Sequence, residues 1–296
     1  MSDLTPSSDS LFSPRRWFSA DDGHIRPVWR AFLFLILGFI VLLLMSGPLH
    51  PFGEGIKRGG WSAGCLLLSW MLLSVFDERS FRTLGLWFYA GWWKETLWGL
   101  LLGALLIALV AAAMLLTGVL TLQGGGAHPK LGGALASGLL LFSTAALFEE
   151  IYFRGYAFQR LIESWGAWGA VLAFSALFGF AHMSNPGATV LGTANTVLAG
   201  VLLAVAYLKT KGLWLPFGLH LSWNYFLGPV FGLPVSGGRF EPSYLQSSIT
   251  GPQWLSGGNY GPEASILLTI VCAAAIGVVW KAPWIAPSPA MQDVLK

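Results

Sequence analysis

The sequence predicts an all-α fold: a polytopic membrane helix bundle of about eight transmembrane helices. Of the 296 residues, 55% are apolar and only 10% are charged, and the mean hydropathy is +0.64. Soluble domains carry about 25% charged residues, so this chain cannot cover a water-exposed surface of its own. The candidate spans are the stretches without Asp, Glu, Lys or Arg. They are 31–53, 59–76, 96–129, 131–148, 164–208, 212–238 and 264–280.

One of these stretches is long enough for two helices. A helix needs about 20 apolar residues to cross a bilayer, and 164–208 contains 45. Ser184-Asn185-Pro186-Gly187 interrupts it, because proline lacks an amide donor and glycine permits positive φ. Eight spans result. The predicted organisation is a mobile cytoplasmic tail at 1–27, three helices at 28–130, a five-helix core at 131–280 and a cytoplasmic tail at 281–296.

The basic residues predict the sidedness of the bundle. When the loops are assigned alternately to the two sides, 13 of the 17 Lys and Arg residues fall on one side. By the positive-inside rule this side is cytoplasmic, so we expect a multi-pass cell-membrane protein with both termini in the cytoplasm. The other side receives Lys57, Arg58, Lys130 and Arg239.

The charge of the chain argues against nucleic acid as a partner, and its cysteines argue against a disulfide framework. The net charge is only +3, and the basic residues are too scattered to form a nucleic-acid-binding stripe. Cys65 and Cys272 each lie in an apolar run, where a thiol behaves as a small buried hydrophobe, so we expect no disulfide framework. The expected partners are the lipid bilayer and no nucleic acid. The sequence gives no indication of the oligomeric state.

Two adjacent carboxylates end an apolar run. Glu149 and Glu150 follow 131–148, and Arg154 comes four residues after Glu150. A charge in mid-membrane costs about 2.5 to 3.5 kcal/mol and needs a partner or a wet cavity. Glu150 and Arg154 can form an i, i+4 ion pair, and Glu149 points about 100° away around the helix. The alternative is that both glutamates merely end the span at the headgroups.

Two histidine motifs follow on later spans. His182 ends the fifth span, and His220 lies four residues before Asn224 on one face of the seventh. A lone histidine in an apolar helix is usually a packing residue. Glu149, however, lies 17 residues before Gly166 and His182 lies 16 after it, which places both about 25 Å from a turn there. This matching requires the fourth helix to continue through Arg154 and Arg160.

Glu149-Glu150-x-x-x-Arg154, Phe178-x-x-x-His182 and His220-x-x-x-Asn224 resemble, in this order, the signature motifs of the type II CAAX prenyl endopeptidases. These belong to the CAAX-protease and bacteriocin-processing (CPBP) family, whose bacterial members include the Abi and lysostaphin-resistance-protein-A-like branch. The resemblance covers about residues 132–280. It implies a bundle with a polar cavity and an endopeptidase acting on a protein or peptide substrate at the membrane, with 131–280 as the catalytic core. A bacterial source is the expectation.

The residues allow two hydrolytic mechanisms. In the first, Glu149 is the general base, His182 orients the water, and His220 with Asn224 stabilises the oxyanion. Glu150 with Arg154 would then support the first carboxylate. In the second, zinc is a cofactor bound by Glu149, His182 and His220, because two histidines and a carboxylate form a known hydrolytic site. His-Glu-x-x-His, the common zinc-protease motif, does not occur.

Two other functional classes stay open. Buried ionisable residues also occur in ion- or proton-coupled transporters, and a non-catalytic immunity or scaffold protein could use the same bundle. The absence of an internal repeat and the clustering of the intramembrane ionisable residues in three helices favour the enzyme.

Overall fold

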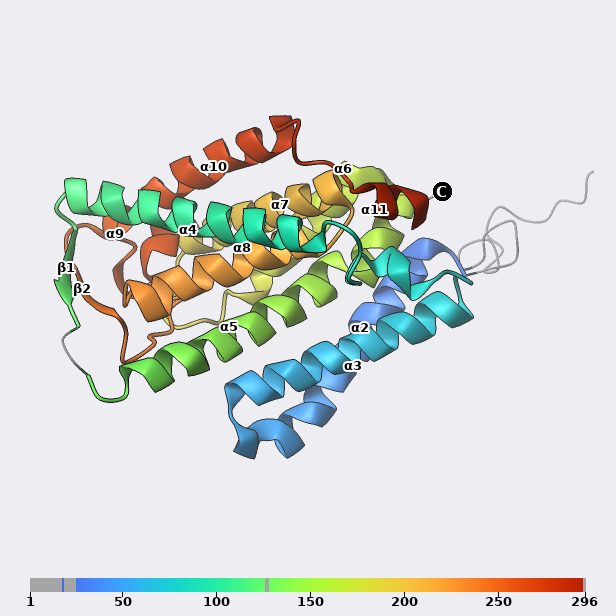
Figure 1. The fold of residues 1–296 in the computed structure, drawn as a ribbon, viewed down its shortest axis with the longest axis horizontal. Helices are drawn as coiled ribbons and strands as arrows, with labels where there is room; N and C mark the ends of the chain where they lie inside the picture. The colour runs from blue at the N-terminus through green and yellow to red at the C-terminus, as the bar shows by residue number, and fades with distance from the viewer. Residues whose placement is uncertain (1–17, 19–24, 126–127, 295–296) are drawn as a thin grey trace, which may run out of the picture.

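The computed structural model describes residue 18 and residues 25–125 and 128–294. The predicted tail at 1–27 lies almost entirely outside the described residues. The described chain is a bundle of helices with one small two-stranded sheet at its left-hand end in Figure 1. The predicted all-α membrane bundle is therefore confirmed as a fold class.

The long helices follow the predicted stretches closely. They are α2 (Pro27–Leu49), α3 (Glu54–Val75), α4 (Trp92–Leu116), α5 (Leu131–Arg154), α6 (Tyr156–Ala181), α7 (Val190–Thr210), α8 (Trp214–Tyr225) and α10 (Ile266–Lys281). Short helices connect or extend them: η1 (His50–Phe52), η2 (Phe81–Leu84), the π-helix η3 (Phe226–Val230), α9 (Gln253–Ser256), η4 (Gly258–Tyr260), η5 (Pro262–Ala264) and α11 (Pro289–Val294).

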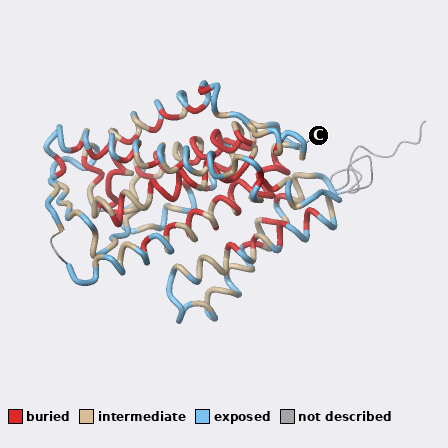
Figure 2. Tube along the Cα trace, in the orientation of Figure 1, coloured by how far each residue is buried: buried red, intermediate tan, exposed pale blue. Residues whose placement is uncertain are grey.

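Several of these helices have the length and composition of membrane spans. Within the described residues they are α2 with η1, α4, the stretch 131–181 and α7, and α10 is apolar but shorter. Buried residues gather in the middle of the bundle and exposed ones on its outer helices (Figure 2). The exposed outer positions are apolar, as lipid contact requires, and the count of eight crossings stays a prediction. They include Ile36, Phe39, Leu43 and Leu44 on α2 and Leu101, Leu105 and Leu109 on α4.

The predicted break in the stretch 164–208 is confirmed. Helix α6 ends at Ala181 and α7 begins at Val190. Between them Gly187 has a φ of +72°, which glycine adopts without strain. The hydroxyl of Thr189 accepts a hydrogen bond of 2.9 Å from the Gly192 amide, so a side-chain cap fixes the start of α7.

The prediction that the fourth helix runs through Arg154 and Arg160 was wrong. Helix α5 ends at Arg154, and Gly155 has non-helical angles (φ −80°, ψ −132°). A Cβ at Gly155 would clash with the Ile151 carbonyl, so only glycine fits this break. Arg160 therefore lies on α6. The predicted turn is present at Gly166, which interrupts α6 with a φ of +73°.

The apolar stretch 96–129 is only partly helical. After α4 the chain forms strand β1 (Leu120–Gly124), which pairs antiparallel with β2 (Leu245–Ile249), from Leu120 opposite Ile249 to Gly124 opposite Leu245. Strand β2 belongs to residues 232–265, which we call the strap. The strap contains only short elements, which are β2, α9, η4 and η5. The sheet joins it to the end of α4.

Glycines bring α4 and α8 into close contact. Gly99 on α4 faces Gly218 on α8, with a Cβ on Gly99 placed 3.0 Å from the Gly218 Cα, and Gly103 on α4 faces the backbone of Leu219 and Trp223. Small residues let helix backbones approach in this way inside membranes. The contact places α8, with His220 and Asn224, in the centre of the bundle.

Buried ion pairs hold the bundle at the end that carries the C-terminus. The Asp77 carboxylate, after α3, accepts from Arg30 on α2 and from Arg160 on α6, the latter at 2.6 Å. On α11, Met291 is fully buried beside Tyr89 and Trp214. We call this the termini end. It is the right-hand end of Figure 1, opposite the strap.

Reporter fusions test the predicted sidedness. Fusions of alkaline phosphatase and of green fluorescent protein after residues 55, 85 and 296 should report a cytoplasmic position at 85 and 296 and an extracytoplasmic position at 55, because the positive-inside rule places the termini end in the cytoplasm. Phosphatase activity from the fusion at 296 would contradict the eight-helix topology.

Candidate active site

One cavity of about 270 Å³ contains all four predicted catalytic residues. Its walls come from α3, α5, α6, α7 and α8, and residues of the strap complete it. The predicted residues in its lining are Glu149, His182, His220 and Asn224. Residues more than 70 positions apart in the sequence therefore meet at one place.

The two carboxylates at the end of α5 occupy different environments. The Glu150 side chain is fully buried, whereas Glu149 keeps 15% of its side chain exposed and lines the cavity. The difference follows from the rotation of about 100° between successive helical residues. Only Glu149 can therefore meet a water molecule or a substrate.

His220 lies between both carboxylates. Its Nδ1 donates a hydrogen bond of 2.8 Å to Glu150 Oε1, since a carboxylate only accepts. Its Nε2 faces Glu149 Oε2 at 3.6 Å, which is too long for a direct hydrogen bond. Glu150 thus fixes the orientation of the ring and the position of one proton, and Nε2 points toward the second carboxylate.

Arg154 holds Glu150 from the other side. The predicted i, i+4 ion pair is present, with Arg154 Nη1 at 3.3 Å from Glu150 Oε1 and both side chains almost fully buried. Arg154 Nη2 also donates to the Gly200 carbonyl on α7 at 3.3 Å, and the guanidinium lies 4.4 Å from the Phe178 ring centroid. The pair therefore connects α5, α6 and α7 in the interior of the bundle.

His182 enters the cavity from the C-terminal end of α6. Its Nδ1 donates to the Phe178 carbonyl at 2.7 Å, because a carbonyl oxygen can only accept. The ring packs on Phe178 with the centroids 4.6 Å apart. In the neutral ring Nε2 is then a hydrogen-bond acceptor.

Asn224 lies one turn after His220 on the same face of α8. Its side chain is half-buried and lines the cavity. It makes no hydrogen bond to the described part of the chain, and its amide is available to a ligand. One helix therefore presents an imidazole and a free amide to the same space.

Sequence reasoning missed three charged residues of the cavity, which are Arg58, Arg239 and Glu263. Arg58 on α3 lies 3.8 Å from Glu149 Oε1 and equally far from Glu54 Oε2. Glu263, in η5, accepts hydrogen bonds from Trp223 Nε1 at 3.0 Å and from the amide and hydroxyl of Ser236. The only sequence signal of Arg58 and Glu263 is a charge close to the end of an apolar stretch.

A serine-hydrolase pattern in the sequence has no matching structure. Gly60-Trp61-Ser62-Ala63-Gly64 has the spacing of a nucleophile elbow, which needs a sharp strand-to-helix turn. Ser62 instead lies inside α3, is buried, and donates to the Arg58 carbonyl at 3.0 Å. It does not line the cavity.

The alternative zinc site stays a prediction. Within the described residues, no group of three His, Cys, Asp or Glu side chains is gathered closely enough to hold a metal ion as the side chains stand. His220 uses Nδ1 on Glu150 and His182 uses Nδ1 on the Phe178 carbonyl, so each offers Nε2, as metal-binding histidines commonly do.

Removing Arg154 should destabilise the fold. Arg154→Ala leaves the Glu150 carboxylate buried without its cation, at a cost of about 3 to 5 kcal/mol. Thermal unfolding of the purified variant in detergent would measure this. Arg82→Ala, which removes an exposed arginine from the termini end, is the matched control and should unfold as the unaltered protein does. Equal stability of the two variants would contradict a structural role for the pair.

Comparison with known proteins agrees with the motifs. Residues 131–226 match the family model described as type II CAAX prenyl endopeptidase Rce1-like. No curated protein and no solved structure gave a match. The matched segment runs from α5 to the end of α8 and contains Glu149, Glu150, Arg154, His182, His220 and Asn224. Over this segment the chain is therefore similar to type II CAAX prenyl endopeptidases.

Proposed function

We propose that this protein is an intramembrane endopeptidase that hydrolyses a peptide bond of a protein or peptide substrate at the cell membrane, with Glu149 as the general base. The observation that carries this proposal is the convergence of Glu149, His182, His220 and Asn224 on one cavity. Three of these groups can exchange or orient protons, and the fourth can donate to a developing charge.

Activation of water is the first step. The Glu149 carboxylate accepts one proton of a water molecule whose oxygen attacks the carbonyl carbon of the scissile bond. Nε2 of His182 accepts a hydrogen bond from the other proton, because its Nδ1–H is held by the Phe178 carbonyl. The two acceptors together orient the water for attack.

Stabilisation of the oxyanion and protonation of the amine follow. The Asn224 amide donates to the oxyanion. The proton taken by Glu149 moves to His220 Nε2 once substrate binding shortens their separation from 3.6 Å to hydrogen-bond distance, while the Nδ1–H proton stays on His220 and remains bonded to Glu150. Nε2–H then donates to the oxyanion and delivers its proton to the leaving nitrogen as the C–N bond breaks. Glu150 thus has the orienting role of the aspartate in a catalytic triad.

Glu149→Gln tests the general base. The variant keeps the shape of the side chain but cannot accept a proton, so cleavage of an identified substrate should fall by about 10²- to 10⁴-fold while folding is retained. The measurement is the initial rate of peptide release from purified protein in liposomes. Glu54→Gln is the matched control: it removes the other carboxylate near Arg58 and should cleave normally. A transporter or a scaffold would release no peptide even without the substitution.

Asn224→Ala tests the oxyanion donor. Loss of one such donor lowers turnover by about 10²- to 10³-fold. Because the interaction forms mainly in the transition state, kcat should fall and KM should change little. A rise in KM with unchanged kcat would instead assign Asn224 to substrate binding.

Elemental analysis tests the alternative with zinc. If Glu149 is a general base that acts without a metal, the purified protein should cleave with less than stoichiometric zinc, and phenanthroline should leave the rate unchanged. Stoichiometric zinc that is lost in His182→Ala, together with inhibition by phenanthroline, would make Glu149, His182 and His220 ligands.

A further inference from the structure

We propose that the catalytic cavity is entered from the strap face of the bundle, opposite both termini. With cytoplasmic termini, the substrates are then protein segments exposed on the extracytoplasmic side of the membrane. This inference rests on the proposed function for the identity of the reaction, but the path of entry follows from the cavity walls alone.

The cavity is closed toward the termini end. None of its lining residues comes from the described segments at that end, which are 77–91, 155–166, 209–213 and 281–294. Ile151, Tyr156 and Phe158 are fully buried beyond the carboxylates, and Arg154 is 1% exposed. Further toward the termini end, the Asp77 carboxylate forms ion pairs with Arg30 and Arg160. A substrate coming from this side would have to displace a packed core and buried ion pairs.

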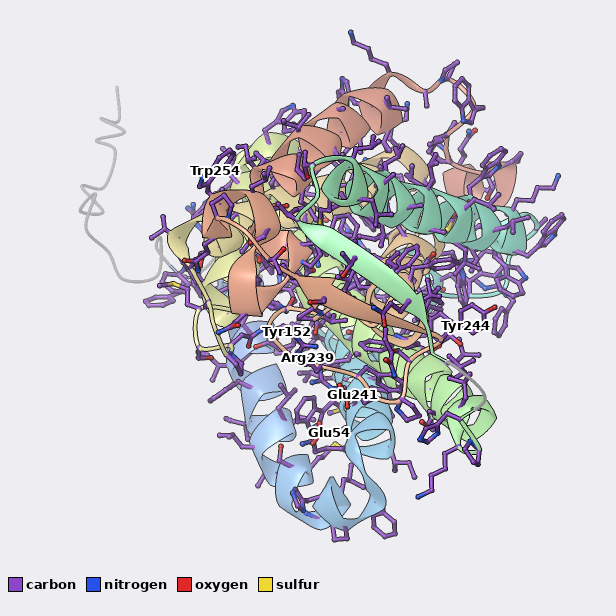
Figure 3. The ribbon with its side chains drawn as sticks, turned by 90° about the vertical axis from the view of Figure 1, so that its left-hand side faces the viewer. Glu54, Tyr152, Arg239, Glu241, Tyr244 and Trp254 are labelled. Carbon is purple, nitrogen blue, oxygen red and sulfur yellow. The ribbon has the colours of Figure 1, made fainter. Side chains whose placement is uncertain are left out.

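The cavity reaches the surface at the strap. Its lining includes Ser236, Arg239 and Phe240 of the strap and Asn185 of the loop between α6 and α7. Arg239 is exposed and also lines the cavity. Figure 3, which looks onto this face, shows Arg239 between the strap and the hairpin of α2 and α3. Solvent therefore meets the cavity wall here.

The catalytic groups lie at different depths from this face. His182 directly follows the strap-side end of α6. Glu149 lies deeper, 18 residues after the start of α5 at Leu131, which is about 27 Å at 1.5 Å per residue. A substrate that enters at the strap therefore has to reach into the bundle to meet Glu149.

Modification of single cysteines measures the path of entry. The native Cys65 and Cys272 are both fully buried, so the unaltered protein is the unreactive background. Arg239→Cys places a thiol at the strap face, and Ala145→Cys places one on the cavity wall, one turn before Glu149. Arg82→Cys is the matched control at the termini end. Ala199→Cys, on the α7 wall, replaces Ala145→Cys if that variant does not fold.

The reagent is sulfonatoethyl methanethiosulfonate, which does not cross membranes. It is applied to intact spheroplasts or to inside-out vesicles, and thiols that remain free are then detected after denaturation by the mass shift with maleimide-polyethylene glycol. Cys65 and Cys272 also react after denaturation, so the signal is the additional mass shift of the introduced cysteine. The expected result is loss of this additional shift for Arg239→Cys and Ala145→Cys in spheroplasts only, and for Arg82→Cys in vesicles only.

Each other pattern overturns the proposal in a distinct way. Modification of Ala145→Cys and Ala199→Cys from vesicles only would place the entrance at the termini end. Modification of Arg239→Cys from vesicles would place the strap in the cytoplasm. Wall cysteines that react from neither side would show a closed cavity. None of these results depends on cleavage, so an active Glu149→Gln variant would refute the proposed mechanism and leave the entry path standing.

Discussion

The fold depends on one constraint: two carboxylates end a membrane helix, and each must have a partner. Taking a charge out of water costs several kcal/mol, which only close partners can offset. Glu150 finds its partners in His220 of α8 and Arg154 of its own helix, and Arg154 also binds the Gly200 carbonyl of α7. The need to pair one buried charge therefore fixes three helices around the cavity, and Glu149 remains as the carboxylate that faces it.

Sequence reasoning predicted the elements governed by local rules. The break at 184–187 follows from proline and glycine, and the Glu150–Arg154 pair follows from helical periodicity. The contact of Arg58 with Glu149 could not be predicted, because it depends on how far α3 is shifted along α5. The helix break at Gly155 was missed for a related reason: a glycine inside a helical pattern is often tolerated, and only packing against Leu84 and Ile151 decides otherwise.

The first three helices contribute to the site although they lie outside the matched segment. Helix α3 supplies Arg58, and the Tyr152 hydroxyl on α5 donates to the Leu35 carbonyl on α2 at 2.9 Å. Gly38 on α2 leaves room for the Tyr152 ring. We therefore propose that 28–130 is a support for the catalytic core of 131–280, holding the outer face of α5 and adding a cation beside Glu149, rather than an independent domain.

The strap is held firmly enough to shape the entrance. Glu263 accepts hydrogen bonds from Trp223 on α8 and from Ser236 within the strap. These bonds join the strap directly to the helix that carries His220. Asn195 on α7 donates to the carbonyls of Glu263 and Ser265, each at 2.9 Å, and its own oxygen accepts from Thr269 on α10. Because these bonds anchor the strap where it meets α10, the positions of Ser236 and Arg239 are tied to those of His220 and Asn224. The strap that is proposed to admit a substrate is thus hydrogen-bonded, through Glu263 and Trp223, to the helix that carries His220 and Asn224.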